Sequence, residues 1–218
     1  DWRCGGTWLV GLEALPNLAD GSVSGLPLTG SALRAAHDLV PVSTWHKAQL
    51  SVVRPGYPQR SAAENDAAFG FRLRRDAAHV DGLHAEGPQK RRHIREPHAF
   101  ILGLALTEAD QGASPLVAWE GSHLLMGAAF KGAAQGADPA ALAEIDVTRA
   151  YQAARKEVFD RCTRHVLHLP VGGAVLLHRH LLHGVSPWQA GSHAPPEGRA
   201  MAYFRPEFPD IARWIAAP

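Results

Sequence analysis

The sequence predicts a mainly β protein, folded as one barrel-like domain with helices that brace the outside of one sheet. Several short segments rich in β-branched or apolar residues are stopped by Gly and Pro, as strands are. One long segment, residues 138–162, instead repeats apolar residues at three- and four-residue spacing, as an amphipathic helix does. The length of 218 residues, with 46% hydrophobic and 20% charged residues, suits one soluble domain spanning residues 1–218.

Composition excludes several classes of function. The net charge of +1 gives no reason to expect a nucleic-acid partner. No apolar run approaches the ~20 residues that cross a bilayer, so we expect no membrane association and a cytoplasmic location. Cys4 and Cys162 form no C-x-x-C pair, which predicts two unpaired thiols in a reducing compartment. The chain begins at Asp1 without a methionine, which leaves open whether residues precede it.

The N-terminal third of the chain is expected to lead into the first strands. Residues 1–45 read as a wrapping arm, in which Ser31 can cap a short helix. Residues 47–54 are β-branched and are followed by Pro-Gly, which predicts a strand. Residues 69–75 alternate apolar and charged side chains and are expected to be extended.

The middle of the chain carries the most hydrophobic segment. Residues 98–106 form a nearly continuous apolar run, which predicts a strand buried on both faces. Residues 115–119 are expected to form another strand, before a tight reversal at 120–123. The helix of residues 138–162 is expected to begin at Asp138-Pro139 and to brace the outside of a sheet.

The last third contains three histidines in one short segment, residues 172–184. In an unbroken strand His178 and His180 would share a face and His183 would lie on the other. We therefore expect a turn near residues 179–180, with a new strand beginning at Leu181. Residues 164–169 and 199–205 complete the expected strands.

The tripeptide His79-Val80-Asp81 is the main candidate for chemistry. In an extended strand alternate side chains share a face, so the imidazole and the carboxylate project together while Val80 turns into the protein. A third ligand from another strand would complete a 2-His-1-carboxylate facial triad, which binds non-heme Fe(II) and leaves positions open for O₂ and small molecules. His183, followed by Gly184, is the candidate.

Three other polar features of the sequence each allow two interpretations. Gln49, on the inward face of its strand, either holds a ligand or makes an ordinary buried hydrogen bond. His123 can bind metal, although a histidine that starts a helix more often caps or packs. The basic segment 87–95 is either a solvated loop or a loop that faces the metal and attracts an anionic substrate.

These motifs resemble the phytanoyl-CoA dioxygenase family, which also includes ectoine hydroxylase. The resemblance rests on His79-Val80-Asp81, on residues 115–123 ending in Gly-Ser-His, on Leu-Leu-His-Gly around His183, and on Arg199, and it covers residues 47–205. It implies a double-stranded β-helix, or jelly roll, that catalyses Fe(II)/2-oxoglutarate-dependent oxygenation. A small-molecule substrate, of which an anion is one candidate, would be hydroxylated with O₂.

The resemblance also implies roles for individual residues. His79, Asp81 and His183 become the iron ligands, and Arg199 becomes the cationic partner of the far 2-oxoglutarate carboxylate. Arginine suits that carboxylate because its planar fork donates two parallel hydrogen bonds. Gln49 is a further candidate for the co-substrate site, and Arg205, on the same strand face as Arg199, is the alternative anchor.

Two other classes of function stay open at this point. A cupin-like metalloenzyme would keep the triad but use no 2-oxoglutarate. A non-catalytic jelly-roll module would bind a ligand and use the histidines only structurally. The substrate and the oligomeric state are not defined by the sequence.

Overall fold

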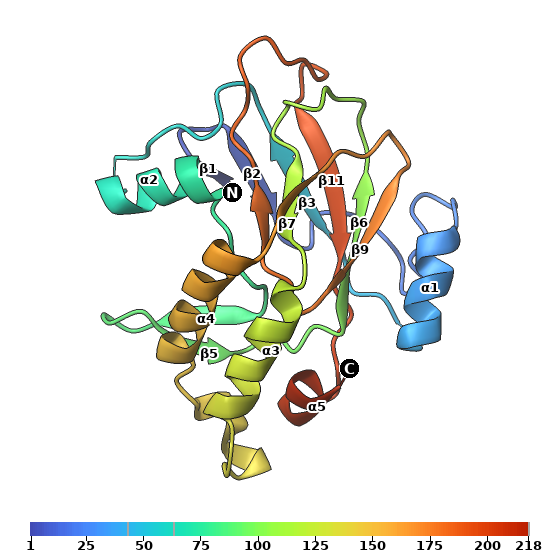
Figure 1. Cartoon of the computed structure of the whole chain (residues 1–218). Helices are drawn as coiled ribbons and strands as arrows, with labels where there is room; N and C mark the ends of the chain where they lie inside the picture. Colours follow the sequence, from blue (N-terminus) through green and yellow to red (C-terminus); the bar gives the residue numbers. More distant parts are fainter. Residues whose placement is uncertain (43, 63, 218) are drawn as a thin grey trace.

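Antiparallel strands in a large and a small sheet form the centre of the protein, seen in a computed structural model that describes residues 1–42, 44–62 and 64–217 (Figure 1). The large sheet has the order β1-β2-β3-β11-β6-β9 and the small sheet the order β10-β7-β8. Strands β4 and β5 form a separate hairpin. The strands are β1 (Trp2–Arg3), β2 (Trp8–Gly11), β3 (Gln49–Val53), β4 (Leu83–Glu86), β5 (Arg91–Ile94), β6 (Phe100–Ala105), β7 (Leu116–Trp119), β8 (Arg164–Leu167), β9 (Ala174–His178), β10 (His183–Val185) and β11 (Arg199–Phe204).

Helices lie around and below the sheets. The helix α1 packs on β6 and β9, whereas α3 packs on α4 and on α5 (Figure 1). No helix among the described residues has both the length and the apolar character needed to span a bilayer. The helices are α1 (Ser31–Leu39), α2 (Asp66–Arg75), α3 (Ser122–Ala133), the 3-10 helix η1 (Pro139–Glu144), α4 (Thr148–Arg161) and α5 (Ile211–Ala216).

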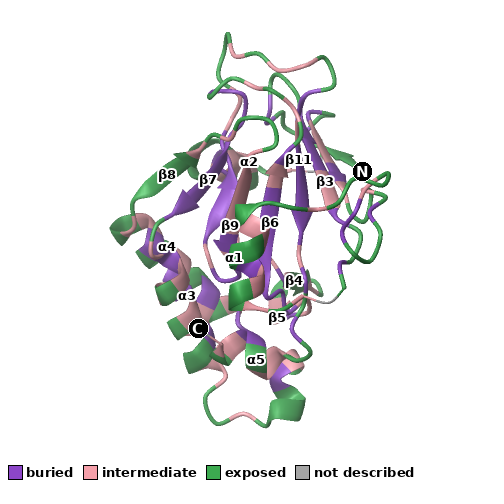
Figure 2. Cartoon of the chain, turned by 90° about the vertical axis from the view of Figure 1, so that its right-hand side faces the viewer, coloured by how far each residue is buried: buried purple, intermediate pink, exposed green. Residues whose placement is uncertain are grey.

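Strand β6 of the large sheet is buried on both faces (Figure 2). On one face Leu102 of β6 belongs to an apolar cluster that includes Ala36 of α1. On the other face Ile101 clusters with Leu116 of the small sheet. Neighbouring residues of a strand point to opposite faces, so β6 serves both clusters. This confirms the predicted double burial within residues 98–106.

The chain passes back and forth between the two sheets. Strand β3 lies in the large sheet, and the chain then reaches β10 of the small sheet through a bridge at His79. It continues through β6 in the large sheet, β7 and β8 in the small one, β9 in the large, β10 in the small and β11 in the large. Over the described residues the sheets stay separate and no closed barrel forms, so the protein mixes antiparallel sheets with helices.

Residues 69–75 are helical, so the expectation of an extended segment there is wrong. They belong to α2, whose cap is Asn65, with a side chain that accepts a hydrogen bond from the Ala68 amide. The ring of Phe71 packs edge-on against Phe159 of α4, with centroids 6.2 Å apart. The cap and this contact favour a helix, although the alternating sequence of the segment suggests a strand.

The segment 138–162 is divided rather than continuous. Asp138 caps η1 by accepting from the Ala140 amide, as its sequence predicts, but the chain ends that helix before α4 begins. Helix α4 buries Tyr151, Ala154 and Val158, as the spacing predicts. It packs mainly on α3, with a smaller contact to β5 of the hairpin, and not across the outside of the large or the small sheet.

The N-terminal segment 1–45 contributes more than a wrapping arm. Strands β1 and β2 extend the large sheet, since β2 pairs with β3 from Trp8↔Val53 to Gly11↔Leu50. Ser31 is the first residue of α1, but Gly30 occupies the cap position and no side chain caps the helix. Cys4 and Cys162 are both free thiols, as expected.

Candidate metal centre

Two chain segments meet where His79 faces His183. The His79 amide donates to the His183 carbonyl over 2.8 Å, and the His183 amide donates back over 3.0 Å. The expected turn after His178 is present, because β9 ends there and β10 begins at His183. The chain leaves α2 through Asp76 and Ala77, whose φ angles of 53° and 52° turn it toward β10.

The three predicted ligands converge at this bridge. His79 Nε2 lies 3.0 Å and His183 Nε2 lies 3.7 Å from Asp81 Oδ1. One ligand atom from each residue lies within 4.8 Å of the others, and no second group of three His, Cys, Asp or Glu side chains among residues 1–42, 44–62 and 64–217 does so. Val80 is 3% exposed and turns into the core as expected, although the tripeptide forms only an isolated β-bridge at His79 and not the expected strand.

Hydrogen bonds to backbone carbonyls orient both imidazoles. His79 Nδ1 lies 3.0 Å from the Ala77 carbonyl and His183 Nδ1 lies 2.9 Å from the Leu181 carbonyl. A carbonyl only accepts, so each Nδ1 carries the proton and each neutral ring leaves Nε2 as an acceptor. When both rings are neutral, two acceptor nitrogens therefore meet a carboxylate oxygen, an arrangement typical of metal ligands.

The charge states suit metal binding. Burial lowers the pKa of His183 to about 4, although Asp81 opposes this, so the ring is neutral at pH 7. Burial acts to raise the pKa of Asp81, but the charge of Arg205, helped by His183 and His79, holds it well below its usual value. For His79, burial acts to lower the pKa, and the hydrogen bond and charge of Asp81 outweigh it and raise it. The neutral ring of His183 and the ionised Asp81 therefore fit a divalent metal ion, whereas His79 would have to give up the proton that Asp81 favours.

Arg205 and Gln49 lie directly beside the three ligands. Arg205 Nε donates to Asp81 Oδ2 over 2.7 Å, and Arg205 Nη1 donates to Gln49 Oε1 over 2.5 Å. The sequence places both residues near the site but does not reveal that they contact each other. Gln49 thus makes a hydrogen bond to a protein side chain, and its role in holding a ligand stays a prediction.

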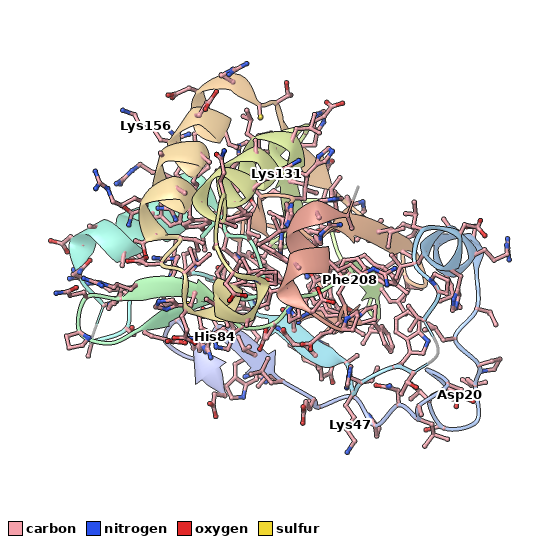
Figure 3. All side chains as sticks on the ribbon, turned by 90° about the horizontal axis from the view of Figure 1, so that it is seen from below. Asp20, Lys47, His84, Lys131, Lys156 and Phe208 are labelled. Carbon is pink, nitrogen blue, oxygen red and sulfur yellow. The ribbon has the colours of Figure 1, made fainter. Side chains whose placement is uncertain are left out.

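The ligands open into two connected spaces between the sheets and the hairpin. An inner cavity of about 180 Å³ lies between the sheets and is lined by His183, Leu116, Tyr203 and Arg205, among others. An outer cavity of about 290 Å³ also touches the ligands His79 and Asp81. Its remaining wall includes Arg92, His84 and Tyr151, and Figure 3 shows His84 between the hairpin and the N-terminal strands.

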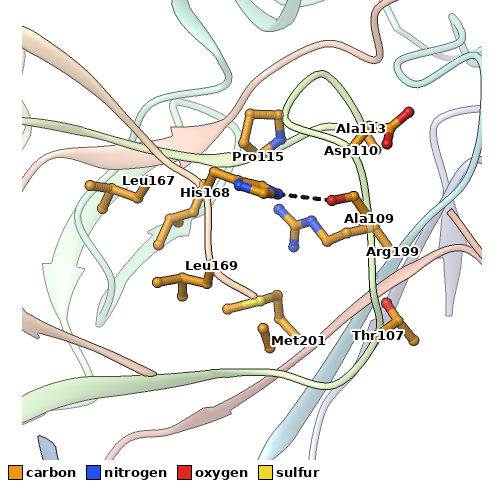
Figure 4. Close-up of a pocket in the computed structure, with 12 residues that line it drawn as sticks. Thr107, Ala109, Asp110, Ala113, Pro115, Leu167, His168, Leu169, Arg199 and Met201 are labelled. Atoms are coloured by element: carbon orange, nitrogen blue, oxygen red, sulfur yellow. Dashed lines mark hydrogen bonds between the residues drawn. The ribbon is translucent and has the colours of Figure 1, made fainter. Parts of the chain in front are cut away.

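Arg199 lies deeper between the sheets than Arg205. Its side chain is buried and Nη2 donates to the Ser114 carbonyl, while Nη1 has no partner. The Ser114 hydroxyl is also buried and without a partner. Figure 4 shows Arg199 in a small cavity beside Pro115 and His168. Leu116 lines both this cavity and the inner cavity, so the two cavities are neighbours.

Three other candidate histidines, His123, His165 and His168, line neither of the two cavities at the ligands. The His123 ring stacks near His178, with centroids 4.9 Å apart, in line with a packing role. His165 and His168 are both exposed, and they contact Glu120 and the Ala109 carbonyl respectively. Neither faces the metal centre, which agrees with the limit of one inward residue set by their parity.

The basic segment 87–95 is a hairpin and not a loop, because residues 91–94 form β5. Two of its arginines are neutralised: Arg95 contacts Glu86 at 2.6 Å and Arg91 contacts Asp146 at 3.6 Å. Arg92 instead lines the outer cavity, with Cζ 5.1 Å from the Tyr151 ring centroid and no acidic partner among the described residues. Sequence inspection singles out neither Arg92 nor Ser114.

Comparison with known proteins identifies no family. No family model matches the chain, and no curated protein does. A solved structure of an N-substituted L-amino acid dioxygenase from Burkholderia ambifaria AMMD matches 59% of this chain and 44% of that chain, with 16% identity and a TM-score of 0.23. The structure of such a dioxygenase from the same organism in complex with alpha-KG matches 91% of this chain and 93% of that chain, with 14% identity and a TM-score of 0.27. The chain thus spans less than half of the first structure's length, and similarity at these TM-scores does not establish a shared fold.

Proposed function

We propose that this protein is an Fe(II)/2-oxoglutarate-dependent oxygenase of the phytanoyl-CoA dioxygenase type. The observation that carries the proposal is the convergence of His79 Nε2, His183 Nε2 and Asp81 Oδ1, with both Nδ1 atoms bonded to carbonyls. Two imidazoles and one carboxylate on one side of a site are the ligands of non-heme Fe(II) oxygenases. Bound Fe(II), with 2-oxoglutarate and O₂, supplies the oxidising power to hydroxylate a substrate C–H bond.

The path of the chain supports a double-stranded β-helix as the underlying fold. Strands β3, β11, β6 and β9 lie side by side in the large sheet, and the His79 bridge, β10, β7 and β8 lie side by side in the small one. The chain visits the two sheets alternately, as in a jelly roll of eight strands. In this reading β1 and β2 extend one edge, and the β4–β5 hairpin is inserted before β6.

Arg199 is the residue we assign to the far carboxylate of 2-oxoglutarate. It is 5% exposed and has one guanidinium nitrogen without a partner, next to the unpartnered hydroxyl of Ser114. Buried polar groups are normally hydrogen-bonded, so the pair fits a bound anion. Arg205 is less suited to this role because its guanidinium already donates hydrogen bonds to Asp81 and Gln49.

Arg199→Met should raise the concentration of 2-oxoglutarate needed for half-saturation by about 10- to 100-fold, because a hydrogen bond to a charged group contributes roughly 1.5–3 kcal/mol. Metal affinity should stay the same. Titration of the metal-loaded variant with 2-oxoglutarate measures the effect. Arg54→Met is the matched control, because Arg54 bonds to the Glu197 carbonyl in an exposed position. An unchanged requirement in Arg199→Met would contradict the assignment.

The substrate we propose is a small anionic molecule that enters through the outer cavity. Arg92 offers an unpaired guanidinium there, beside the ring of Tyr151 and within the cavity that touches His79 and Asp81. A carboxylate or phosphate on Arg92 would leave the rest of the molecule facing the metal. A single domain, a cytoplasmic location and the absence of a nucleic-acid partner stay predictions.

Arg92→Met should abolish the preference for anionic substrates. Substrate-stimulated succinate formation, measured with pairs of compounds that differ only in a carboxylate, reports this preference. Arg91→Met is the control, because Arg91 is 59% exposed and faces Asp146. A preference that survives in Arg92→Met but not in Arg91→Met would place substrate binding elsewhere.

Anaerobic titration with Fe(II) and then with 2-oxoglutarate tests the function itself. The expected result is a weak visible charge-transfer band that saturates with 2-oxoglutarate and is absent in Asp81→Asn. Bound iron without this band would favour the cupin-like metalloenzyme. A wild-type protein that binds no iron would favour the non-catalytic module.

A further inference from the structure

The two oxygens of Asp81 have different neighbours. Oδ1 faces the histidines, 3.0 Å from His79 Nε2 and 3.7 Å from His183 Nε2. Oδ2 instead accepts from Arg205 Nε over 2.7 Å. The carboxylate is 12% exposed, so water does not compete strongly for either oxygen.

Arg205 is itself held from more than one side. Gln49 Oε1 accepts from Arg205 Nη1 over 2.5 Å, and the side chain is 18% exposed. Gln49 pairs with Tyr203 in the β3–β11 register, so two neighbouring strands fix the positions of acceptor and donor. The Tyr203 ring lies 5.4 Å from Arg205 Cζ and supports the guanidinium from another side. The arginine is therefore preorganised toward Asp81.

A carboxylate beside a metal ion can bind through one oxygen or through both. Binding through both would use one of the positions that a facial triad leaves open. A charge-assisted hydrogen bond to Oδ2 opposes this, since that oxygen would have to leave Arg205. A bond of this type shifts an equilibrium by about 10- to 100-fold.

We propose that Arg205 is a positioning residue that holds Asp81 as a one-oxygen metal ligand and thereby keeps positions free for the co-substrate and O₂. The inference rests on the proposed function. It also gives a role to an arginine that lines both cavities and bonds to Asp81. Gln49 has the supporting role of orienting Arg205.

Co(II) is the probe for this proposal, because its visible d–d bands report on the ligands without any catalysis. Wild type, Arg205→Met, Arg205→Lys and Gln49→Leu are titrated with Co(II) and then with 2-oxoglutarate, without oxygen. Arg3→Met is the matched control: it removes an arginine that lines the same cavities and, among the described residues, makes no hydrogen bond or ion pair with Asp81. Thermal unfolding of each metal-free variant checks that it is folded.

The expected result for Arg205→Met is a shifted Co(II) spectrum and an affinity for 2-oxoglutarate about tenfold weaker, with Co(II) affinity within about threefold of wild type. Arg205→Lys should restore the wild-type spectrum in part, because it keeps one charged donor. Gln49→Leu should change the spectrum and the 2-oxoglutarate affinity less than Arg205→Met does. This variant keeps the proposal testable if Arg205→Met does not fold.

Three outcomes would overturn the inference. In the first, Arg205→Met and Gln49→Leu keep the wild-type spectrum and 2-oxoglutarate affinity. In the second, folded Arg205→Met no longer binds Co(II), so that Arg205 decides whether the metal binds and not how Asp81 binds it. In the third, wild type itself binds no Co(II), which would overturn the proposed function as well. The first two leave the proposed function intact.

Discussion

A single glycine allows the two histidine-bearing segments to meet. A Cβ at Gly184 would lie 2.2 Å from the Asp76 carbonyl oxygen and 3.2 Å from Ala78 Cα. Those backbone atoms lead directly to His79, and the Val185 amide donates to the same Asp76 carbonyl over 2.9 Å. Position 184 therefore needs glycine for close approach of two backbones, and not for a special backbone angle.

Gly184→Ala should separate His79 from His183. We expect the free energy of unfolding to fall by roughly 1–3 kcal/mol, as for other overpacked sites, and Co(II) affinity to fall by tenfold or more. Urea unfolding and Co(II) titration measure the two effects. Gly132→Ala is the control, because Gly132 lies in helix α3 and a Cβ there would meet nothing within 4 Å. Equal effects at both positions would exclude the close-approach explanation.

Two of the three candidate ligands could be found from sequence because their pattern is local. His79 and Asp81 are two residues apart, and a strand sends such a pair to one face. The bond between Arg205 and Asp81 joins residues 124 apart, and no local pattern encodes it. For the same reason Arg199 and Arg205, on one strand face, could not be told apart until the structure placed them beside different partners.

At the scale of elements, a short sequence pattern predicts the wrong element where both the strand period and the helix period fit the same residues. In residues 69–75 the alternation Phe-Gly-Phe-Arg-Leu-Arg-Arg suits a strand, yet over seven residues it does not exclude one helical face. The helix cap at Asn65, outside that window, decides the matter. The sequence does not reveal the hairpin at Leu83–Ile94, because polar side chains make up half of β4 and all of β5 except Ile94. Longer patterns, as in residues 98–106, gave the correct element.

The docking of α5 onto α3 depends on a buried neutral histidine. His180 is 2% exposed, with ring centroids 4.2 Å from Trp214 of α5 and 5.3 Å from Phe130 of α3. Burial lowers the pKa of His180 to about 2, helped by the charge of Arg179 and by the neighbouring histidines His178 and His123.

This burial should make the protein sensitive to acid. Below the ordinary histidine pKa of about 6.5 the unfolded chain binds a proton that folded His180 does not, so stability falls as pH falls. Between pH 6.5 and 5 the loss from this residue should approach ~2 kcal/mol, because each unit of pH costs about 1.4 kcal/mol. Urea unfolding at pH 7 and pH 5 measures it. His180→Phe should reduce the difference between the two pH values, whereas His165→Gln, at an exposed position, should not. If His180→Phe loses as much stability between pH 7 and pH 5 as the wild type does, other groups cause the acid sensitivity.

At the scale of the whole molecule, the metal centre ties the two sheets together. His183 belongs to β10 of the small sheet, while Asp81 is bonded through Arg205 to the end of β11 in the large sheet. Gln49 of β3 extends this link across the large sheet. A metal ion held by His79, Asp81 and His183 therefore joins segments that the unfolded chain keeps far apart, so binding should favour the folded state alone.

Metal binding should accordingly raise the Tm of the whole protein. A ligand at 100 times its Kd stabilises the folded state by about 2.7 kcal/mol, which for a domain of this length corresponds to roughly 5–10 °C. Differential scanning calorimetry with Co(II) measures the shift, and a further rise on adding 2-oxoglutarate would report the second site. Asp81→Asn should show neither rise, because it keeps the shape of the side chain but loses the charge that a cation requires. An equal rise in Asp81→Asn would mean that Co(II) stabilises the protein at another place, and the link between the sheets would then rest on hydrogen bonds alone.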